Sequence, residues 1–160
     1  MKTLKRIETY NSTPDKVFKC IDDLGVTGMH MTKSSMPMMG GKLDLNFLTV
    51  NHTGLGSKYR WTGKVVGMPM DFMVEVTKWV MGKEKIWETI GEPKMIIYSW
   101  FRMQLDISAA SEGTKAELSI SYKKPKGWLN RLLSFFLAGW YCNWCLRNML
   151  EDSKKSLEKV

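Results

Sequence analysis

Apolar and polar residues alternate over most of the chain before residue 123, the pattern of strands with one buried face. The alternation begins in residues 2–10 and returns at residue 42. Turn signals rich in glycine, proline and asparagine then divide the chain at short intervals, one of them at residues 91–94. No strand–helix–strand repeat interrupts them, so the pattern favours antiparallel pairing. The predicted strands are 2–10, 42–47, 57–64, 71–77, 85–90, 95–108 and 115–122.

Helical periodicity marks two other regions. Ser12 or Thr13 is suited to cap a helix with Pro14 in its first turn, and apolar residues then recur at helical spacing until Gly25. A second short helix or turn followed by a loop is expected in residues 26–41. After the break at residues 124–127, the rest of the chain predicts one long helix to about Lys159.

The predicted order is one strand, two short helices, six strands and a long C-terminal helix, which indicates the α+β class. The chain has 160 residues, a length that suits one domain, 1–160. A strongly curled sheet facing one long helix leaves a gap between them, and a ligand would lie there.

Three short motifs in this order carry a resemblance to a known superfamily. They are Ser12-Thr-Pro-Asp-Lys-Val-Phe after the first strand, Gly54-Leu-Gly-Ser-Lys-Tyr-Arg-Trp leading the third, and Glu112-Gly-Thr-Lys-Ala-Glu-Leu in the last hairpin. The chain resembles the START-like (SRPBCC) helix-grip superfamily, which includes polyketide cyclase/dehydrase-like and lipid-transport proteins. The resemblance implies a curved seven-stranded antiparallel sheet gripping the C-terminal helix, with an apolar cavity for a hydrophobic or amphipathic molecule between them. It implies no particular reaction.

Alternation also predicts which side chains face that cavity. They lie opposite the lysines and glutamates of each strand, and the long helix adds several more. The alternative is that these large side chains simply fill the core. The predicted ligand-binding residues are Tyr59, Trp61, Phe72, Val74, Trp87, Met103, Leu105, Leu118, Tyr122, Phe136, Trp140 and Asn143.

Composition and charge suggest possible partners. The 13 Met and 7 Trp offer large, adaptable apolar surface. The formal net charge is +8, and Lys123, Lys124, Lys126, Trp128 and Arg131 adjoin an apolar half-helix. Basic residues with a tryptophan beside apolar surface suit transient contact with an anionic membrane, although a solvated flank explains them equally well. No nucleic-acid-binding motif is present, so we expect no nucleic-acid partner.

The chain is expected to be cytoplasmic, because it opens with no signal peptide and its three cysteines make no closed disulfide set. The uncharged run 132–146 is shorter than the roughly 20 residues of a membrane-spanning helix. It predicts a buried or cavity-covering helix. Both a monomer and a homodimer are compatible with the sequence.

The sequence offers few candidates for catalysis or metal binding. His30 and His52 lie in predicted loops, and Asp44, Glu75 and Glu117 alternate outward. Two groups could bind a metal or act as a redox pair: the methionines and histidine in residues 29–39 as Cu(I) ligands, and the pair Cys142 and Cys145. We favour the simpler explanations, which are a flexible apolar lid for the first group and buried small side chains for the second. We therefore predict no catalytic residue, metal or cofactor.

The leading hypothesis is a protein that binds, and possibly transports, a small hydrophobic or amphipathic molecule in a cavity between the sheet and the C-terminal helix. Two hypotheses from other classes stay open. One is a polyketide cyclase/dehydrase-like enzyme acting on a ligand in the same cavity. The other is a membrane-docking or partner-binding module whose core is filled.

Overall fold

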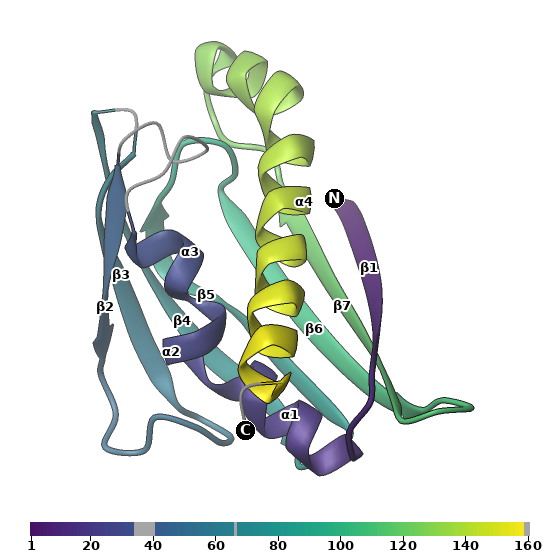
Figure 1. The fold of residues 1–160 in the computed structure, drawn as a ribbon. Coiled ribbons are helices and arrows are strands. Elements are labelled where there is room, and N and C mark those ends of the chain that lie inside the picture. The colour runs from purple at the N-terminus through teal and green to yellow at the C-terminus, as the bar shows by residue number, and fades with distance from the viewer. Residues whose placement is uncertain (34–40, 66, 159–160) are drawn as a thin grey trace.

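The computed structural model describes residues 1–33, 41–65 and 67–158, which form one antiparallel sheet and four helices (Figure 1). All neighbouring strands pair antiparallel, in the order β1-β7-β6-β5-β4-β3-β2. Six strands follow one another as hairpin neighbours, and only β1 pairs with a strand distant in sequence. The strands are β1 (Lys2–Tyr10), β2 (Lys42–Phe47), β3 (Lys58–Val65), β4 (Met68–Val80), β5 (Glu84–Lys94), β6 (Trp100–Ala109) and β7 (Thr114–Lys123).

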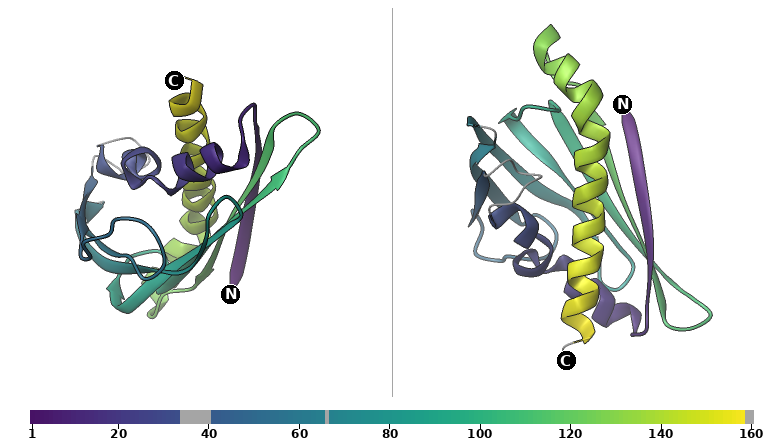
Figure 2. Two further views of the ribbon diagram at one scale, coloured as in Figure 1. Left: turned by 90° about the horizontal axis from the view of Figure 1, so that it is seen from below. Right: turned by 45° about the horizontal axis from the view of Figure 1, so that its top comes forward.

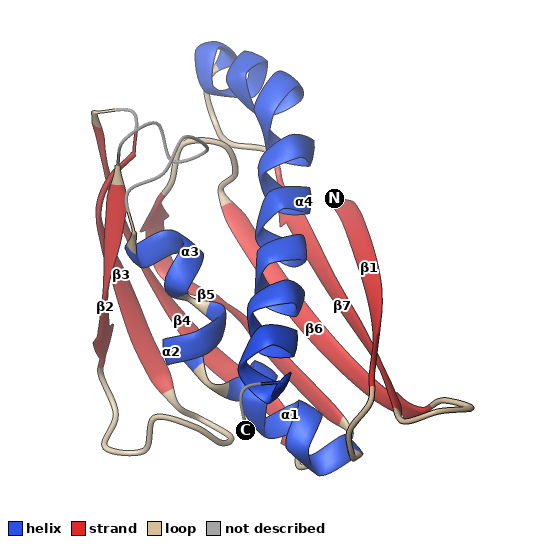
Figure 3. Cartoon of the chain, viewed as in Figure 1, coloured by secondary structure: helices blue, strands red, loops and turns tan. Residues whose placement is uncertain are grey.

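Three short helices carry the chain across one face of this sheet. The chain leaves β1 at one edge and re-enters as β2 at the other edge, so α1 (Pro14–Asp22), α2 (Leu24–Thr27) and α3 (Met29–Thr32) must cross the face between them. The second predicted helix is divided in two at Gly28. All helices lie on the same side of the sheet (Figure 3).

Gly28 is needed where the short helices approach the sheet. A Cβ atom at this position would lie 2.9 Å from the Trp61 ring and 2.6 Å from the Leu24 carbonyl oxygen. Both distances are below ordinary van der Waals contact. The absence of a side chain at Gly28 therefore lets α2 and α3 pack closely against β3.

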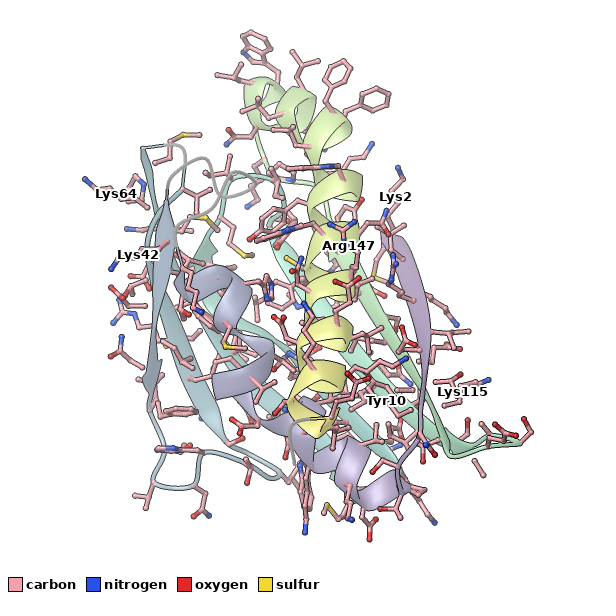
Figure 4. The ribbon with its side chains drawn as sticks, viewed as in Figure 1. Lys2, Tyr10, Lys42, Lys64, Lys115 and Arg147 are labelled. Carbon is pink, nitrogen blue, oxygen red and sulfur yellow. The ribbon has the colours of Figure 1, made fainter. Side chains whose placement is uncertain are left out.

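The long helix α4 (Trp128–Glu158) lies across the concave face, and the sheet curls around its second half (Figure 2). Its buried residues include Ala138, Cys142, Cys145 and Leu146, which recur at helical spacing and mark the face toward the sheet. Near its C-terminal end, the Tyr10 hydroxyl of β1 donates a hydrogen bond to the Leu150 carbonyl at 3.0 Å (Figure 4). The first turns of α4 extend beyond the sheet (Figures 1 and 2).

The strand order and the long helix confirm the predicted fold class, but several predicted boundaries were wrong. β4 begins at Met68, where a turn was predicted, and continues to Val80. β5 continues through Gly91 and Pro93 to Lys94, where a turn was predicted, and β6 begins only at Trp100. Lys94 still pairs with β4, whereas pairing with β6 stops at Glu88. One side of β5 is therefore unpaired beyond Glu88, and a proline without an N–H is tolerated there.

Candidate functional site

A narrow apolar cavity lies between the concave face of the sheet and helices α2, α3 and α4. Its volume is about 50 Å³. Residues from six strands, three helices and the β5–β6 loop form its walls. Those that carry the argument below are His30, Met31, Tyr59, Trp61, Met70, Phe72, Val74, Trp87, Met103 and Met149.

Half of the predicted ligand-binding residues line this cavity. Tyr59, Trp61, Phe72, Val74, Trp87 and Met103 are all in its wall, as strand alternation predicted. Leu105, Leu118 and Tyr122 are also buried, but they pack in the core away from the cavity.

The three predicted helix residues do not line the cavity. Phe136 and Trp140 are 69% and 54% exposed, and Asn143 is exposed as well. The inward direction expected for them was wrong because two facts about α4 were unknown. Its inward face follows Ala138, Cys142 and Cys145, and its first turns extend past the sheet.

The cavity is small because aromatic rings occupy the space. Tyr59 and Trp61 meet edge to face at 6.5 Å between ring centroids, and Phe72 meets Phe101 at 5.8 Å. Ligand pockets for drug-sized molecules usually measure roughly 300–1,000 Å³. A space of about 50 Å³ holds a few water molecules at most. A larger molecule therefore requires the walls to move.

Methionine supplies the means for that movement. Met31, Met70, Met103 and Met149 all contribute to the wall, from α3, β4, β6 and α4. An unbranched thioether side chain has three rotatable bonds and adapts to the shape of its neighbours with little strain. Four such side chains around one cavity make its size adjustable, which is not true of the aromatic rings on the sheet.

His30 is the polar residue of interest in this wall, and the sequence prediction placed it in a loop. It lies in α3, is 8% exposed and meets the Trp144 ring edge to face at 5.0 Å. Neither ring nitrogen makes a hydrogen bond with the residues that the structure describes. Burial lowers the pKa of His30 to about 4, and the Thr27 backbone carbonyl opposes that shift. The imidazole is therefore neutral at pH 7; the Thr27 backbone carbonyl lies beside its donor without good hydrogen-bond geometry, and its acceptor has no partner among the described residues.

A buried ion pair lies between α1 and β5. The Lys85 ammonium lies 2.5 Å from the Asp22 carboxylate, and the Trp79 indole N–H donates to the same carboxylate at 3.0 Å. Both charged side chains are almost fully buried. Burial lowers the pKa of Lys85, and Asp22 opposes this shift.

This pair also touches the cavity wall. The Lys85 nitrogen lies 4.7 Å from the centroid of the Trp87 ring, and the charge of Asp22 helps burial to raise the pKa of Tyr59. Sequence reasoning missed the pair, although Lys85 stands two residues before Trp87 and so shares its inward face. The pair joins α1 to β5.

The candidate metal and redox groups have no supporting geometry in the described part of the chain. Cys142 and Cys145 are buried free thiols, and burial raises the pKa of Cys142 to about 12 and that of Cys145 further. No group of three or more histidine, cysteine or acidic side chains gathers as a metal site among the described residues. Residues 36–39 of the methionine cluster lie outside them.

Comparison with known proteins identifies the fold but no protein of closely similar sequence. No family model and no curated protein matches the sequence. TTHA0849 from Thermus thermophilus has a similar structure, with 14% identity and a TM-score of 0.70 over 96% of this chain and 95% of that protein. The Zhui aromatase/cyclase from Streptomyces sp. R1128 has 9% identity and a TM-score of 0.68 over 98% and 95%.

Plant proteins share the same architecture. Ara h 8.0201 is 12% identical with a TM-score of 0.64 over 99% of both chains. The ginseng major latex-like protein 151 from Panax ginseng is also 12% identical with a TM-score of 0.64, over 97% of this chain and 96% of that one. The resemblance found in the sequence is thus confirmed at the level of the fold: the chain has the START-like helix-grip fold. None of the helices in the described residues is long and apolar enough to span a bilayer.

Proposed function

We propose that this protein binds a small hydrophobic or amphipathic molecule in the cavity between the sheet and helices α2, α3 and α4. The observation that carries the proposal is an apolar cavity whose wall includes a buried polar side chain, His30, that has no well-formed hydrogen bond to the described residues. A buried polar group without a partner destabilises a fold by about 1–3 kcal/mol. A ligand group that hydrogen-bonds His30 would remove this cost.

The site favours a ligand with an apolar body and one uncharged polar group. The walls are mainly aromatic and thioether side chains, so burial of an apolar ligand surface against them is favourable. Neutral His30 offers a donor and an acceptor, so a hydroxyl or a carbonyl can pair with it. A charged group would be expensive to bury beside an uncharged imidazole. The four cavity methionines would move aside as the ligand enters.

The second candidate function is a cyclase/dehydrase-like enzyme that acts in the same cavity. It is favoured by a specific observation, since a histidine and the phenols of Tyr59 and Tyr98 all line the wall. A neutral imidazole can accept a proton from a substrate. The likeness to an aromatase/cyclase is compatible with this role. An enzyme of this kind would show a rate that falls as His30 is protonated, whereas a carrier would release its ligand unchanged.

A reducing compartment such as the cytoplasm is part of the proposal. Its support is that Cys20, Cys142 and Cys145 are all free thiols.

Two measurements test the binding function. Native mass spectrometry of the protein purified from its own host should show a bound molecule that leaves on denaturation. Titration with two matched probes, 2-naphthol and naphthalene, then tests the site. The two probes share an apolar body, and only naphthol carries a hydroxyl.

We expect naphthol to bind between about 2-fold and 10-fold more tightly than naphthalene, the range of one net hydrogen bond. His30→Leu should abolish this preference, and the exposed-residue control Trp140→Ser should keep it. Val74→Phe, which places a ring in the cavity, should weaken both probes. Two results together would show that the cavity is not the binding site. The wild-type protein would bind the two probes with equal affinity, and the folded Val74→Phe protein would bind each probe as tightly as the wild type does.

A further inference from the structure

The first four turns of α4 carry a cluster of large apolar side chains that nothing in the described structure covers. Trp128, Phe135 and Phe136 are 78%, 72% and 69% exposed. Single exposed apolar residues are common, but a contiguous group of large ones marks an interaction surface. We call this group the α4 tip; it consists of Trp128, Leu129, Leu132, Phe135, Phe136, Leu137 and Trp140.

The tip is a free-standing projection and not part of the ligand cavity. The turns that carry it extend beyond the sheet, and aromatic side chains splay outward from them (Figures 1 and 4). Only Ser134 and Ala138 are buried on this stretch, and both are small. The helix therefore rests on the body through a narrow strip while its other faces are open.

A belt of positive charge adjoins the tip, at the end of β7, in the connection to α4 and in the first turn of α4. Lys123, Lys124, Lys126 and Arg131 are all exposed, and none of them forms an ion pair within the described part of the chain. The sequence contains no acidic residue between Glu117 and Glu151. The first turn of α4 is likewise free of acidic side chains, so the positive end of the helix dipole is not neutralised.

We propose that the α4 tip docks on the surface of a bilayer that contains anionic lipids. Its aromatic and aliphatic side chains would enter the boundary between headgroups and acyl chains, where tryptophan is favoured. The lysines and Arg131 that adjoin it would contact the lipid phosphates. This inference is independent of the proposed function, because no residue of the tip lines the ligand cavity.

The geometry favours a bilayer over a second copy of the chain. Successive helix residues are about 100° apart, so the side chains of the tip spread over about half of the helix circumference or more. A single partner helix would cover one stripe of this surface and leave the rest in water. Lipid surrounds an inserted helix on every apolar side. A second copy would also bring two belts of lysines together, whereas an anionic bilayer attracts them.

Co-sedimentation with vesicles tests the proposal. The full-length protein is mixed with vesicles of phosphatidylcholine containing phosphatidylserine, or of phosphatidylcholine alone. We expect the protein to pellet with the anionic vesicles and tryptophan emission to shift to the blue as Trp128 and Trp140 leave water. Binding should weaken as salt rises from about 0.1 M to about 1 M, since the Debye length falls from about 10 Å to about 3 Å.

Matched variants separate the tip from the rest of the surface. Phe135→Ser with Phe136→Ser should reduce binding at least tenfold, and Leu55→Ser, which removes an equally exposed apolar side chain in a distant loop, should leave it unchanged. Lys124→Gln with Lys126→Gln should reduce binding, and Lys16→Gln with Lys115→Gln should reduce it much less. Lys115 lies at the opposite end of the molecule (Figure 4).

Two results would overturn the proposal. One is the absence of binding to anionic vesicles by the folded protein at low salt. The other is a stable dimer in solution that the Phe135→Ser, Phe136→Ser protein cannot form and that does not bind vesicles, since the tip would then be a subunit interface. Circular dichroism confirms that each variant is folded, which is expected because the altered side chains are exposed.

Discussion

Protonation of His30 should make the protein unstable in mild acid. Its imidazole is 8% exposed and makes no hydrogen bond with the described residues, so the folded state resists the added charge. Its pKa is about 4 in the folded protein, against 6.5 for an ordinary histidine. Because the unfolded chain takes up the proton more readily, protons favour unfolding. The stability is complete above pH 6.5 and is lost as the pH falls from 6.5 toward 4.

The size of this effect follows from the two pKa values. A difference between 6.5 and about 4 corresponds to about 3 kcal/mol in the free energy of unfolding once the pH is below both. At about pH 5 the linkage relation gives a loss of about 2 kcal/mol relative to pH 8. Such a loss is a large part of the roughly 5–15 kcal/mol that is typical of domain stability.

Urea unfolding at fixed pH, followed by tryptophan fluorescence, measures this contribution. His30→Leu removes both the proton site and the unpaired nitrogens, so the variant should be more stable than the wild type at pH 8 by about 1–3 kcal/mol. The advantage should grow by about 2 kcal/mol at pH 5. Carboxylates that titrate in the same range are present in both proteins and cancel in the comparison.

His52→Leu is the matched control, because His52 is exposed in the loop after β2. This variant should not reproduce the gain in stability expected of His30→Leu. A stability difference between wild type and His30→Leu that stays constant from pH 8 to pH 5 would refute the reasoning, since it would mean that His30 is solvated or paired in the folded state.

Two further predictions concern contacts that join distant elements. Lys85→Met leaves the Asp22 carboxylate buried without its counter-ion and should lower the free energy of unfolding by about 3–5 kcal/mol. The double variant Lys85→Met, Asp22→Leu should regain most of this loss. If urea titrations show no recovery in the double variant, the two residues are not coupled. Tyr10→Phe removes the hydrogen bond from β1 to the Leu150 carbonyl and should lower stability by about 1 kcal/mol, and an unchanged unfolding midpoint would argue against that bond.

The cavity wall shows how far strand alternation could be used. Tyr59, Trp61 and Trp87 were correctly placed because successive residues of a strand point to opposite faces, and the charged residues beside them fixed the outer face. The same argument would have found Lys85, which shares the face of Trp87. A lysine is rarely buried without a partner, however, and the partner Asp22 lies in a helix far earlier in the chain. Strand periodicity therefore does not indicate that Lys85 is buried.

The cavity residues predicted on α4 were wrong for a different reason. The run 132–146 is apolar nearly all round, so its composition does not indicate which face is buried. Phe136 and Trp140 were assigned to the cavity because large apolar residues usually lie inside. The structure places them outside, because the sheet ends before the first turns of α4. The predicted end of β5 was wrong for a similar reason. Gly91 and Pro93 signal a turn, but they lie in an irregularity of the β4–β5 pairing, which resumes at Lys94.

The sequence by itself determined the order of the elements, the antiparallel sheet and the inward set on the strands, because these depend on local periodicity and on turn residues. Only the tertiary structure decided the size of the cavity, the burial of His30, the Lys85–Asp22 pair and the exposure of the α4 tip. Each of these depends on which distant elements meet and how closely. Periodicity gives the direction of a side chain, but the space left beside it is fixed by packing between segments far apart in the chain.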